Sequence, residues 1–144
     1  MVSQIEIKMI NFDNIALLEQ FVENIGDSEK TFRYFKSRPL SVIANHLVTV
    51  LAVDNNMPMA YGHLDKEEDV IWLGIAVSEN NKGKGLGNLV MNYLINYADQ
   101  MKIKELSLSV DADNTIASNM YKKFRFQEVK ILEKSNTLIM KRSY

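Results

Sequence analysis

The segment from Asp69 to Asn88, DVIWLGIAVSENNKGKGLGN, constrains the fold of this chain more than any other stretch. Val70–Val77 is almost entirely apolar and rich in Val, Ile and Trp, as is typical of a strand buried on both faces. The glycine-rich run Lys82–Gly87 follows a short polar turn. Apolar residues then recur at steps of three and four up to Met101, which predicts an amphipathic helix over residues 85–101.

A strand that leads through glycines into a helix is suited to binding an anion. The first N–H groups of a helix have no partner within it, and the helix dipole places about half a positive charge behind them. Gly83, Gly85 and Gly87 carry no Cβ to keep a ligand off the backbone, and Lys82 and Lys84 add positive charge. The junction therefore predicts a phosphate or pyrophosphate site. The alternative is a flexible turn with solvated lysines.

Composition narrows the function classes. A length of 144 residues fits one domain, residues 1–144, with its own core. A formal net charge of −1 gives no field that attracts nucleic acid or an anionic membrane. The chain has no cysteine and two histidines, which excludes disulfides and thiolate chemistry and argues against a metal centre. No long apolar span or leader is visible, so we expect a cytoplasmic protein.

The pattern along the chain predicts a mixed, mostly antiparallel α/β sheet of about six or seven strands with helices on both faces. One helix is expected to begin at a cap, Asp13 or Asn14, and to end near Gly26. A shorter helix is expected to carry Phe32 and Phe35. A third covers residues 114–123. The expected strands are residues 4–10, 47–53, 59–64, 70–77, 105–110, 126–133 and 137–141.

Two common nucleotide sites fit the glycine run poorly. A P-loop needs G-x-x-x-x-G-K-S/T, which the chain lacks. A dinucleotide fingerprint needs G-x-G-x-x-G, and Asn88 stands where the last glycine belongs, although Asp111 lies near the distance expected for the acidic residue. About half of the chain precedes the glycine run and reads as hairpins rather than βαβ units. Both sites are therefore disfavoured.

The glycine run resembles the phosphate loop of the GNAT superfamily of acyl-CoA-dependent N-acyltransferases, which reads Q/R-x-x-G-x-G/A after a central strand. Lys82 stands where that loop has Gln or Arg, so it keeps the charge but loses the planar fork. A second family segment, N-x-x-A-x-x-x-Y-x-K-x-G-F, resembles residues 114–126, with Arg125 in place of the glycine. The residues that match it are Asn114, Ala117, Tyr121, Lys123 and Phe126. The resemblance covers the order of elements from about Val42 to the C-terminus.

The resemblance implies that the cofactor is acetyl-CoA or a related acyl-CoA. Its pyrophosphate is expected on the amides of residues 83–88, and its pantetheine arm between the strands 70–77 and 105–110, which splay apart in the family. Gly74 suits a bulge or a close ligand there, and a freed amide near Ile75 or Ala76 would stabilise the oxyanion. The expected cofactor-binding residues are Ile75, Ala76, Val77, Lys82, Gly83, Lys84, Gly85, Leu86, Gly87, Asn88, Asn114, Ser118 and Tyr121.

The expected reaction is direct attack of a neutral amine on the thioester. Tyr121 is the candidate proton donor to the departing thiolate, and Asn114 and Tyr121 share one helical face. The candidate general base is His63, because histidine titrates near neutral pH. The alternatives are a histidine that only hydrogen-bonds, His46, or a water chain with no single base. Glu67, Glu68 and Asp69 are expected to form a solvated acidic turn.

The expected activity is an N-acetyltransferase acting on a primary amine of a small molecule, with no nucleic-acid or membrane partner. The basic segment Lys30–Arg38 is either a solvated helix face or a wall of the acceptor site that suits an anionic group. The second reading points to an amino sugar or a nucleotide-linked amino sugar. The alternatives are a non-catalytic acyl-CoA-binding protein and an enzyme for a protein or peptide amine. Dimers are common among GNAT proteins, so a homodimer is a further expectation.

Overall fold

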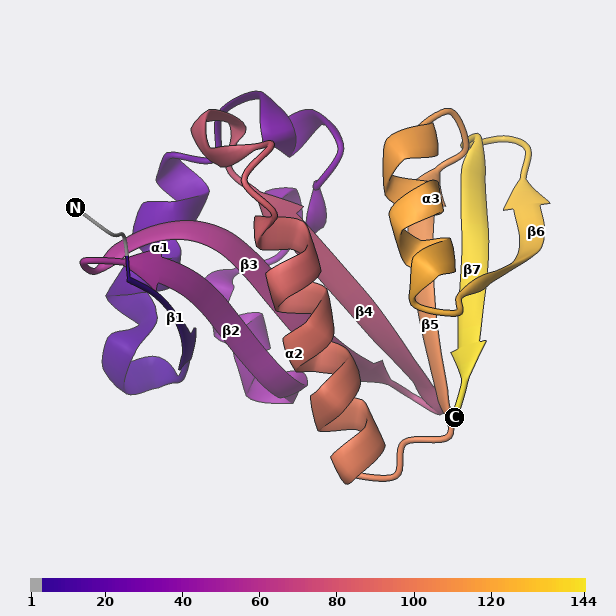
Figure 1. Cartoon of the computed structure of the whole chain (residues 1–144), viewed down its shortest axis with the longest axis horizontal. Helices are drawn as coiled ribbons and strands as arrows, with labels where there is room; N and C mark the ends of the chain where they lie inside the picture. The colour runs from indigo at the N-terminus through magenta and orange to yellow at the C-terminus, as the bar shows by residue number, and fades with distance from the viewer. Residues whose placement is uncertain (1–3) are drawn as a thin grey trace.

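One mixed sheet of seven strands organises the molecule, which a computed structural model describes over residues 4–144. The spatial order is β1–β2–β3–β4–β5–β7–β6, and every neighbouring pair is antiparallel except β4 and β5 (Figure 1). The strands are β1 (Ile5–Met9), β2 (His46–Asp54), β3 (Met57–Glu67), β4 (Val70–Val77), β5 (Glu105–Asp111), β6 (Gln127–Leu132) and β7 (Thr137–Ser143). The predicted mixed, mostly antiparallel sheet is confirmed.

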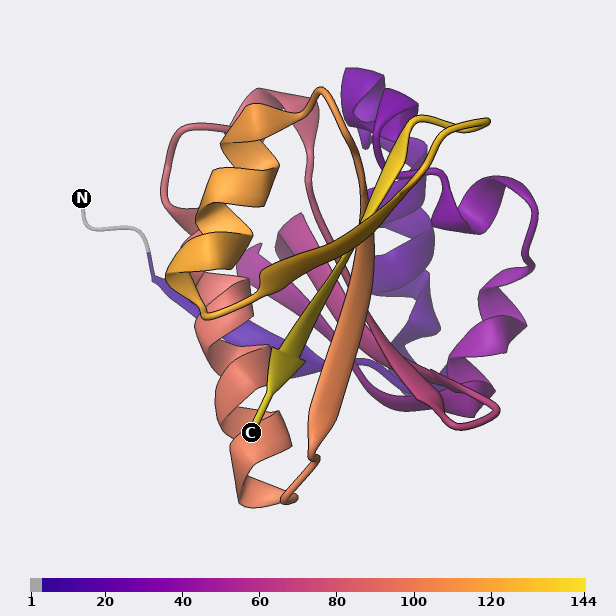
Figure 2. The same cartoon turned by 90° about the vertical axis from the view of Figure 1, so that its right-hand side faces the viewer.

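Helices cover both faces of this sheet. The helices are α1 (Ile15–Glu23), α2 (Leu86–Gln100) and α3 (Thr115–Lys123). Val90 and Leu94 of α2 are fully buried against one face. Phe21 of α1 packs against Tyr61 of β3 on the opposite face, with ring centroids 6.0 Å apart. Figures 1 and 2 show α1 on the far side of the sheet from α2 and α3. Within residues 4–144, no helix is long and apolar enough to cross a bilayer.

The sheet opens between its two parallel strands. β3 and β4 pair over eight residues without a break, whereas Trp72 and Ser107 are the one pair that joins β4 to β5. Figure 1 shows the two strands meeting at one end and diverging towards the N-terminal end of α2. Past Trp72, the β5-facing edge of β4 therefore has no strand partner in the described part of the chain. The splayed strands expected at this point are present.

The N-terminal third differs from expectation in two respects. Asn14 is the N-cap residue of α1, as expected, but its side chain makes no cap bond to that helix, and the Asn11 side chain caps the preceding 3₁₀ turn. Helix α1 ends at Glu23 with Asn24 as its C-cap, close to Gly26 as expected. The expected second helix is instead a set of 3₁₀ turns, Gly26–Lys30, Tyr34–Lys36 and Leu40–Asn45.

The aromatic residues of this segment explain the second difference. Phe32 packs 5.4 Å from the ring of Tyr61, and Tyr34 packs 4.4 Å from the ring of His63, so both point at the sheet. In an α-helix, residues two apart lie about 200° apart around the axis and could not share a face. Docking both rings on β3 therefore excludes a regular helix.

The turn that closes α3 keeps its expected shape without the expected glycine. Arg125 has a φ of 71°, in the left-handed region. Its amide bonds to the carbonyl of Lys122 at 3.0 Å, and the amide of Phe126 bonds to that of Tyr121 at 3.2 Å. This is the paired hydrogen-bond pattern that commonly ends helices at a glycine. Arg125 therefore holds a backbone conformation that glycine would adopt with less strain.

Candidate active site

The loop before α2 exposes backbone donors. Gly83 and Gly85 have φ values of 79° and 78°, and a Cβ built on either would meet no atom within 4 Å. Gly85 is the N-cap of α2 and, as a glycine, supplies no side-chain cap to the amides in the first turn of this 15-residue helix, which have no partner within the helix. Gly83 and Gly85 thus allow the left-handed backbone conformation of the loop, and no side chain at these two positions blocks a ligand.

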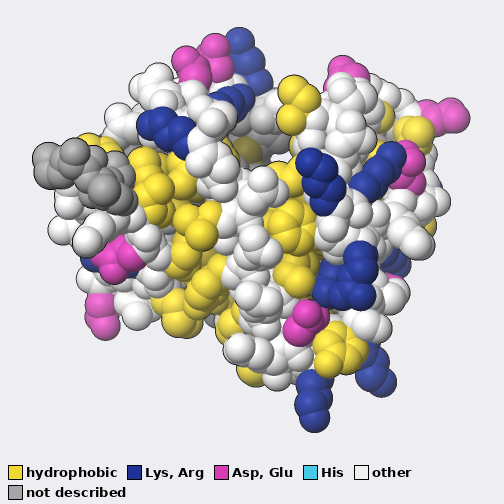
Figure 3. All heavy atoms as spheres, viewed as in Figure 1, with side chains coloured by type: hydrophobic (Ala, Val, Ile, Leu, Met, Phe, Trp, Pro, Cys, Tyr) yellow, Lys and Arg dark blue, Asp and Glu magenta, His cyan; other side chains and the backbone are white. Residues whose placement is uncertain are grey.

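The side chains around the loop contribute less than its backbone. Lys82 and Lys84 are exposed, and the Lys84 ammonium bonds to the Asn81 side chain at 3.1 Å. Gly87 differs from the other two glycines, because a Cβ there would lie 3.3 Å from the sulfur of Met120 in α3. Gly87 therefore allows α2 and α3 to approach each other at the point where β4 and β5 are apart. Figure 3 shows apolar surface beside α2 on this face, with Lys and Arg side chains around it.

Gly74 has a different role from the one expected. The register between β3 and β4 is continuous through Gly74, so that ladder contains no bulge. A Cβ at Gly74 would collide with Nε2 of His63, its cross-strand neighbour. The missing side chain therefore makes room for the imidazole. The free backbone edge at Ile75 and Ala76 arises from the splay of β4 and β5 rather than from a bulge.

Helix α3 presents its predicted residues beside this opening. Asn114 caps the helix, its side-chain oxygen accepting from the Ala117 amide at 3.2 Å. Ser118 and Tyr121 are buried, each with 7 % of its surface exposed. Burial raises the pKa of the Tyr121 phenol well above its ordinary value, so this hydroxyl keeps its proton at neutral pH. The ring of Phe126 packs edge-on against that of Tyr121 at 6.0 Å.

His63 lies on the opposite face of the sheet, in a dense aromatic cluster. It is 2 % exposed, and its Nδ1 lies 2.5 Å from the hydroxyl of Tyr61, two residues away on the same strand face. The ring of His46 lies 4.5 Å from that of His63 and is tilted by 46° against it. Burial, then the neighbouring His46 and Arg38, lower the pKa of His63 well below its usual value. His63 is therefore neutral at pH 7, and its Nε2 faces the backbone of Gly74.

A hydrogen-bonded chain of side chains runs beside His63. The Tyr34 hydroxyl donates to the Asp65 carboxylate at 2.8 Å and lies 2.7 Å from Nε2 of His46. Nδ1 of His46 lies 2.8 Å from the hydroxyl of Thr49. Burial lowers the pKa of His46 to about 4, and Asp65 partly opposes this shift. The sequence gives no role to Tyr34 or Asp65, although the two-residue period of β3 places Asp65 on the face of Tyr61 and His63.

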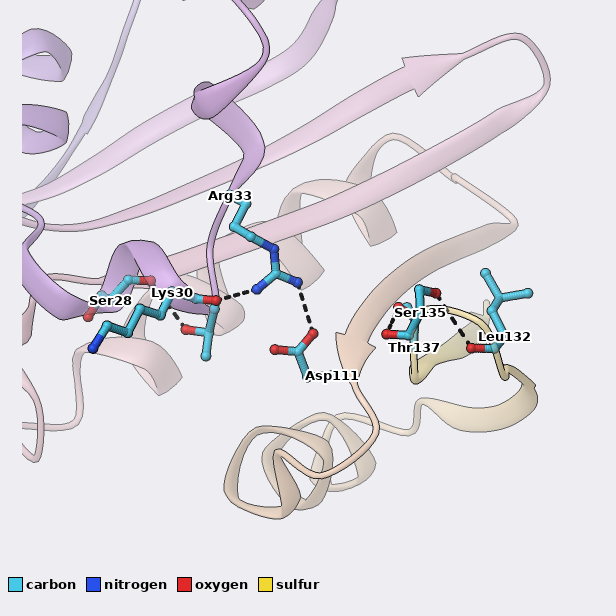
Figure 4. A network of polar contacts seen from close by, with 8 residues as sticks. Ser28, Lys30, Arg33, Asp111, Leu132, Ser135 and Thr137 are labelled. Carbon is cyan, nitrogen blue, oxygen red and sulfur yellow. Dashed lines mark hydrogen bonds and ion pairs between the residues drawn. The ribbon is translucent and has the colours of Figure 1, made fainter.

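The basic segment is largely neutralised by carboxylates. Arg38 lies 4.3 Å above the Tyr34 ring. Arg33 reaches from the N-terminal segment to Asp111 at the end of β5 at 3.0 Å, as Figure 4 shows. The other pairs are Lys30–Asp27 at 3.8 Å, Lys36–Glu29 at 3.2 Å and Arg38–Glu67 at 3.9 Å. The segment is therefore a surface of paired positive and negative side chains and not a purely cationic wall of the acceptor site.

The glycine loop at a helix N-terminus and the splayed parallel strands together form an arrangement that suits a nucleotide-type diphosphate beside a sheet. Residues 12–126 match the sequence model of the acetyltransferase (GNAT) family. The chain belongs to this family of enzymes, which transfer the acetyl group of acetyl-CoA. No curated protein sequence matches the chain significantly.

Solved structures of low sequence identity share the fold. An N-acetyltransferase from Staphylococcus aureus Mu50 aligns with a TM-score of 0.78 and 13 % identity, over 98 % of this chain and 99 % of that one. The ribosomal-protein-S18-alanine N-acetyltransferase of Escherichia coli aligns at 0.73 and 17 %, over 97 % and 94 %. A GNAT acetyltransferase from Elizabethkingia anophelis with acetyl-CoA bound aligns at 0.74 and 16 %, over 97 % and 98 %.

Proposed function

We propose that the protein acetylates the primary amine of a small molecule, by direct attack of the amine on the thioester of acetyl-CoA. The observation that carries the proposal is the uncapped, sterically open start of α2 next to the free edge of β4. An amino sugar, free or nucleotide-linked, is our first candidate acceptor, because Arg33 and Arg38 border the face where His63 lies. An anionic group of the acceptor would have to compete with Asp111 or Glu67 for these cations.

The side of the site that binds the acetyl donor, here called the donor side, consists of backbone groups and a few side chains of the chain itself. Acetyl-CoA supplies an activated acetyl thioester. The amides of residues 83–88 bind its diphosphate, with Lys82 and Lys84 adding charge at the rim. The free backbone edge at Ile75 and Val77 binds the pantetheine arm as an added strand would. An amide at Ile75 or Ala76 stabilises the oxyanion of the tetrahedral intermediate, and Asn114 and Ser118 line the channel.

Two proton transfers complete the reaction. Tyr121 protonates the departing thiolate, a role that suits a buried phenol which keeps its proton at neutral pH. His63 is our candidate acceptor of the amine proton, because it is neutral and its Nε2 faces β4 where the sheet opens. Its depressed pKa makes it a weak base, so this transfer depends on the strongly acidic character of the amine nitrogen once it has attacked the thioester.

A thiol-release assay with a panel of amines tests this function. The panel should contain glucosamine, glucosamine 6-phosphate, a nucleotide-linked amino sugar, spermidine and a short peptide with N-terminal alanine. Release of CoA with a small amine supports the proposal. A protein that CoA protects against thermal unfolding but that releases no thiol with any amine is a non-catalytic binder.

A second candidate is a protein or peptide amine. Two proteins of the same fold are described as ribosomal-protein alanine N-acetyltransferases, from Escherichia coli and Brucella melitensis. Turnover of the alanine peptide without turnover of the small amines would favour this candidate.

A further inference from the structure

Asp65 is a buried carboxylate with no cation to balance it. Its exposed fraction is 3 %, and none of the ion pairs formed within residues 4–144 includes it. The nearby imidazoles of His46 and His63 are neutral at pH 7, because burial lowers the pKa of both. Arg38 pairs with Glu67 instead. Burying a carboxylate without an opposite charge is unfavourable, so such a group needs a reason beyond packing.

The position of Asp65 suggests that reason. Asp65 lies opposite Trp72 across the β3–β4 ladder, and Trp72 in turn lies opposite Ser107 at the single contact between β4 and β5. The carboxylate is therefore one strand away from the point where the sheet begins to open. It lies on the face away from α2, which it shares with the half-exposed indole of Trp72 and the half-buried ring of Tyr34.

The hydrogen bonds of Tyr34 have one consistent direction. Because Tyr34 gives its proton to Asp65, its oxygen accepts from Nε2–H of His46, and Nδ1 of His46 then accepts from the Thr49 hydroxyl. This arrangement requires the neutral imidazole that the lowered pKa of His46 provides. The phenol is thus held between a proton acceptor and a donor, at 2.8 and 2.7 Å.

We propose that the Asp65 carboxylate is the docking group for the acceptor amine, which arrives as an ammonium ion, and that Tyr34 relays its proton. This inference deepens the proposed function and rests on it. The N–H bond of the ammonium breaks, its electron pair stays on nitrogen, and the proton moves to the Tyr34 oxygen. The original hydroxyl proton of Tyr34 moves to Asp65. The neutral amine is then free to attack, and Asp65 returns its proton to water after the product leaves.

This assignment selects a class of acceptor. A primary alkylamine has a pKa near that of lysine, about 10, and is an ammonium ion at neutral pH. Docking on Asp65 converts an unbalanced buried charge into an ion pair, which favours cationic amines over neutral isosteres such as alcohols. His63 keeps the role proposed above, as acceptor of the proton that the nitrogen releases after its attack. This second step is separable because no hydrogen bond joins His63 to the Tyr34–Asp65 pair among the described residues.

Asp65→Asn tests the docking role, with Glu6→Gln of the edge strand β1 as a control, because Glu6 pairs with Lys8 and has no part in the candidate site. For the best acceptor of the amine panel, Asp65→Asn should raise KM by about tenfold to a hundredfold, the usual effect of losing a hydrogen bond to a charged group. KM for acetyl-CoA should not change. The same variant should melt at a higher temperature than the wild type, because it removes an unpaired buried charge. Glu6→Gln should change neither the KM for the amine nor the melting temperature.

Tyr34→Phe tests the relay, with Tyr97→Phe as the control because the Tyr97 hydroxyl bonds to the Leu47 carbonyl, away from this chain. The phenyl ring keeps the contacts with Arg38 and His63. We expect kcat to fall by about a hundredfold with an unchanged KM for the amine. A wild-type kcat in Tyr34→Phe would overturn the relay.

Asp65→Asn also separates this inference from the proposed function. A lower melting temperature together with an unchanged amine KM would overturn the docking role and make Asp65 a structural residue. If the wild type acetylates no amine of the panel, the proposed function fails. The melting temperature of Asp65→Asn then still decides whether Asp65 carries an unbalanced charge, and a decrease would overturn that claim.

Discussion

The two sides of the candidate site use different kinds of chemical group, main-chain amides on the donor side and side chains on the acceptor side. On the donor side, the loop at Gly83–Asn88 offers the main-chain N–H groups of a helix N-terminus, in a conformation set by glycines with positive φ. On the acceptor side, Tyr34, His46, His63 and Asp65 form a close-packed cluster of side chains between β3 and the N-terminal segment. On the function proposed above, the first side binds by the shape and dipole of the helix N-terminus, whereas the second depends on the protonation of individual side chains.

This difference has consequences for how each side tolerates change. A backbone cradle is insensitive to most substitutions except those that add bulk or negative charge at its glycines. A buried polar cluster fails when one member loses its partner, because the remaining group is left desolvated and unpaired. Variants of the donor side should therefore mostly alter binding of acetyl-CoA, and variants of the acceptor side should alter kcat, pH dependence and stability.

The largest expected effect tests whether the donor side needs a side chain for chemistry. Tyr121→Phe should lower kcat by about a hundredfold or more, the usual contribution of a positioned acid, because no group would protonate the thiolate. The affinity for acetyl-CoA should be largely kept, since the loop that binds the diphosphate is untouched. Steady-state kinetics and calorimetry measure the two quantities, with Tyr93→Phe of α2 as the control. An unchanged kcat would remove Tyr121 from the mechanism.

The next prediction concerns the pH dependence of the acceptor side. The pKa of His46 is about 4 in the folded protein and about 6.5 when unfolded, so below pH 6.5 the unfolded state binds more protons than the folded state. Stability contributed by the neutral ring is present above pH 6.5 and is lost as the pH falls towards 4. His46 alone should remove about 2 kcal/mol of unfolding free energy between pH 7.5 and 5.

His63 should add to this loss with the same sign, because its pKa is also lowered by burial. Urea denaturation between pH 7.5 and 5 measures the effect, and His46→Gln should flatten the dependence. A free energy of unfolding that stays constant or rises as the pH falls would show that the two rings are not held neutral.

A third prediction isolates charge on the donor side. Gly85→Asp and Gly85→Asn have nearly the same shape, and both residues tolerate the left-handed conformation and cap helices well. Only aspartate places a negative charge beside the bound diphosphate. Gly85→Asp should therefore bind CoA about 30-fold more weakly than Gly85→Asn, from about 2 kcal/mol of repulsion. Calorimetry in low salt measures the ratio, and equal affinities would place the diphosphate elsewhere.

The smallest effect comes from α3, the helix that carries Tyr121. Arg125 holds a left-handed conformation with a φ of 71°. Arg125→Gly should relieve this strain and stabilise the fold by about 1 kcal/mol. The greater backbone freedom of glycine in the unfolded chain should offset part of that gain. The turn and its hydrogen bonds should be unchanged, and kcat should be unaffected. Thermal denaturation and kinetics check both expectations. Destabilisation would mean that the Arg125 side chain contributes contacts that outweigh the strain.

The same contrast explains what could be predicted from the sequence. The donor side is contiguous, so strand β4, the glycine run and helix α2 could be recognised together from residues 69–101. The acceptor cluster joins residues 34, 46, 63 and 65 across β2, β3 and a 3₁₀ turn, and no local pattern links them. His63 was found from its chemistry. Tyr34 and Asp65 were missed because their roles depend on tertiary contacts.

Two predictions from local sequence patterns failed because they could not include contacts between distant residues. Gly74 suggested a bulge or a ligand, but the structure gives its space to His63, a contact between strands that no sequence pattern encodes. The short aromatic segment at Phe32–Phe35 suggested a helix, yet docking on β3 imposes 3₁₀ turns. In both cases packing against the sheet overrode the local preference.

The most direct test of this account is a crystal structure of the protein with CoA. We expect the diphosphate to accept hydrogen bonds from the amides between Gly83 and Asn88, and the sulfur to lie near the Tyr121 hydroxyl in the opening between β4 and β5. A diphosphate bound away from the start of α2, or a thiol end remote from Tyr121, would contradict it.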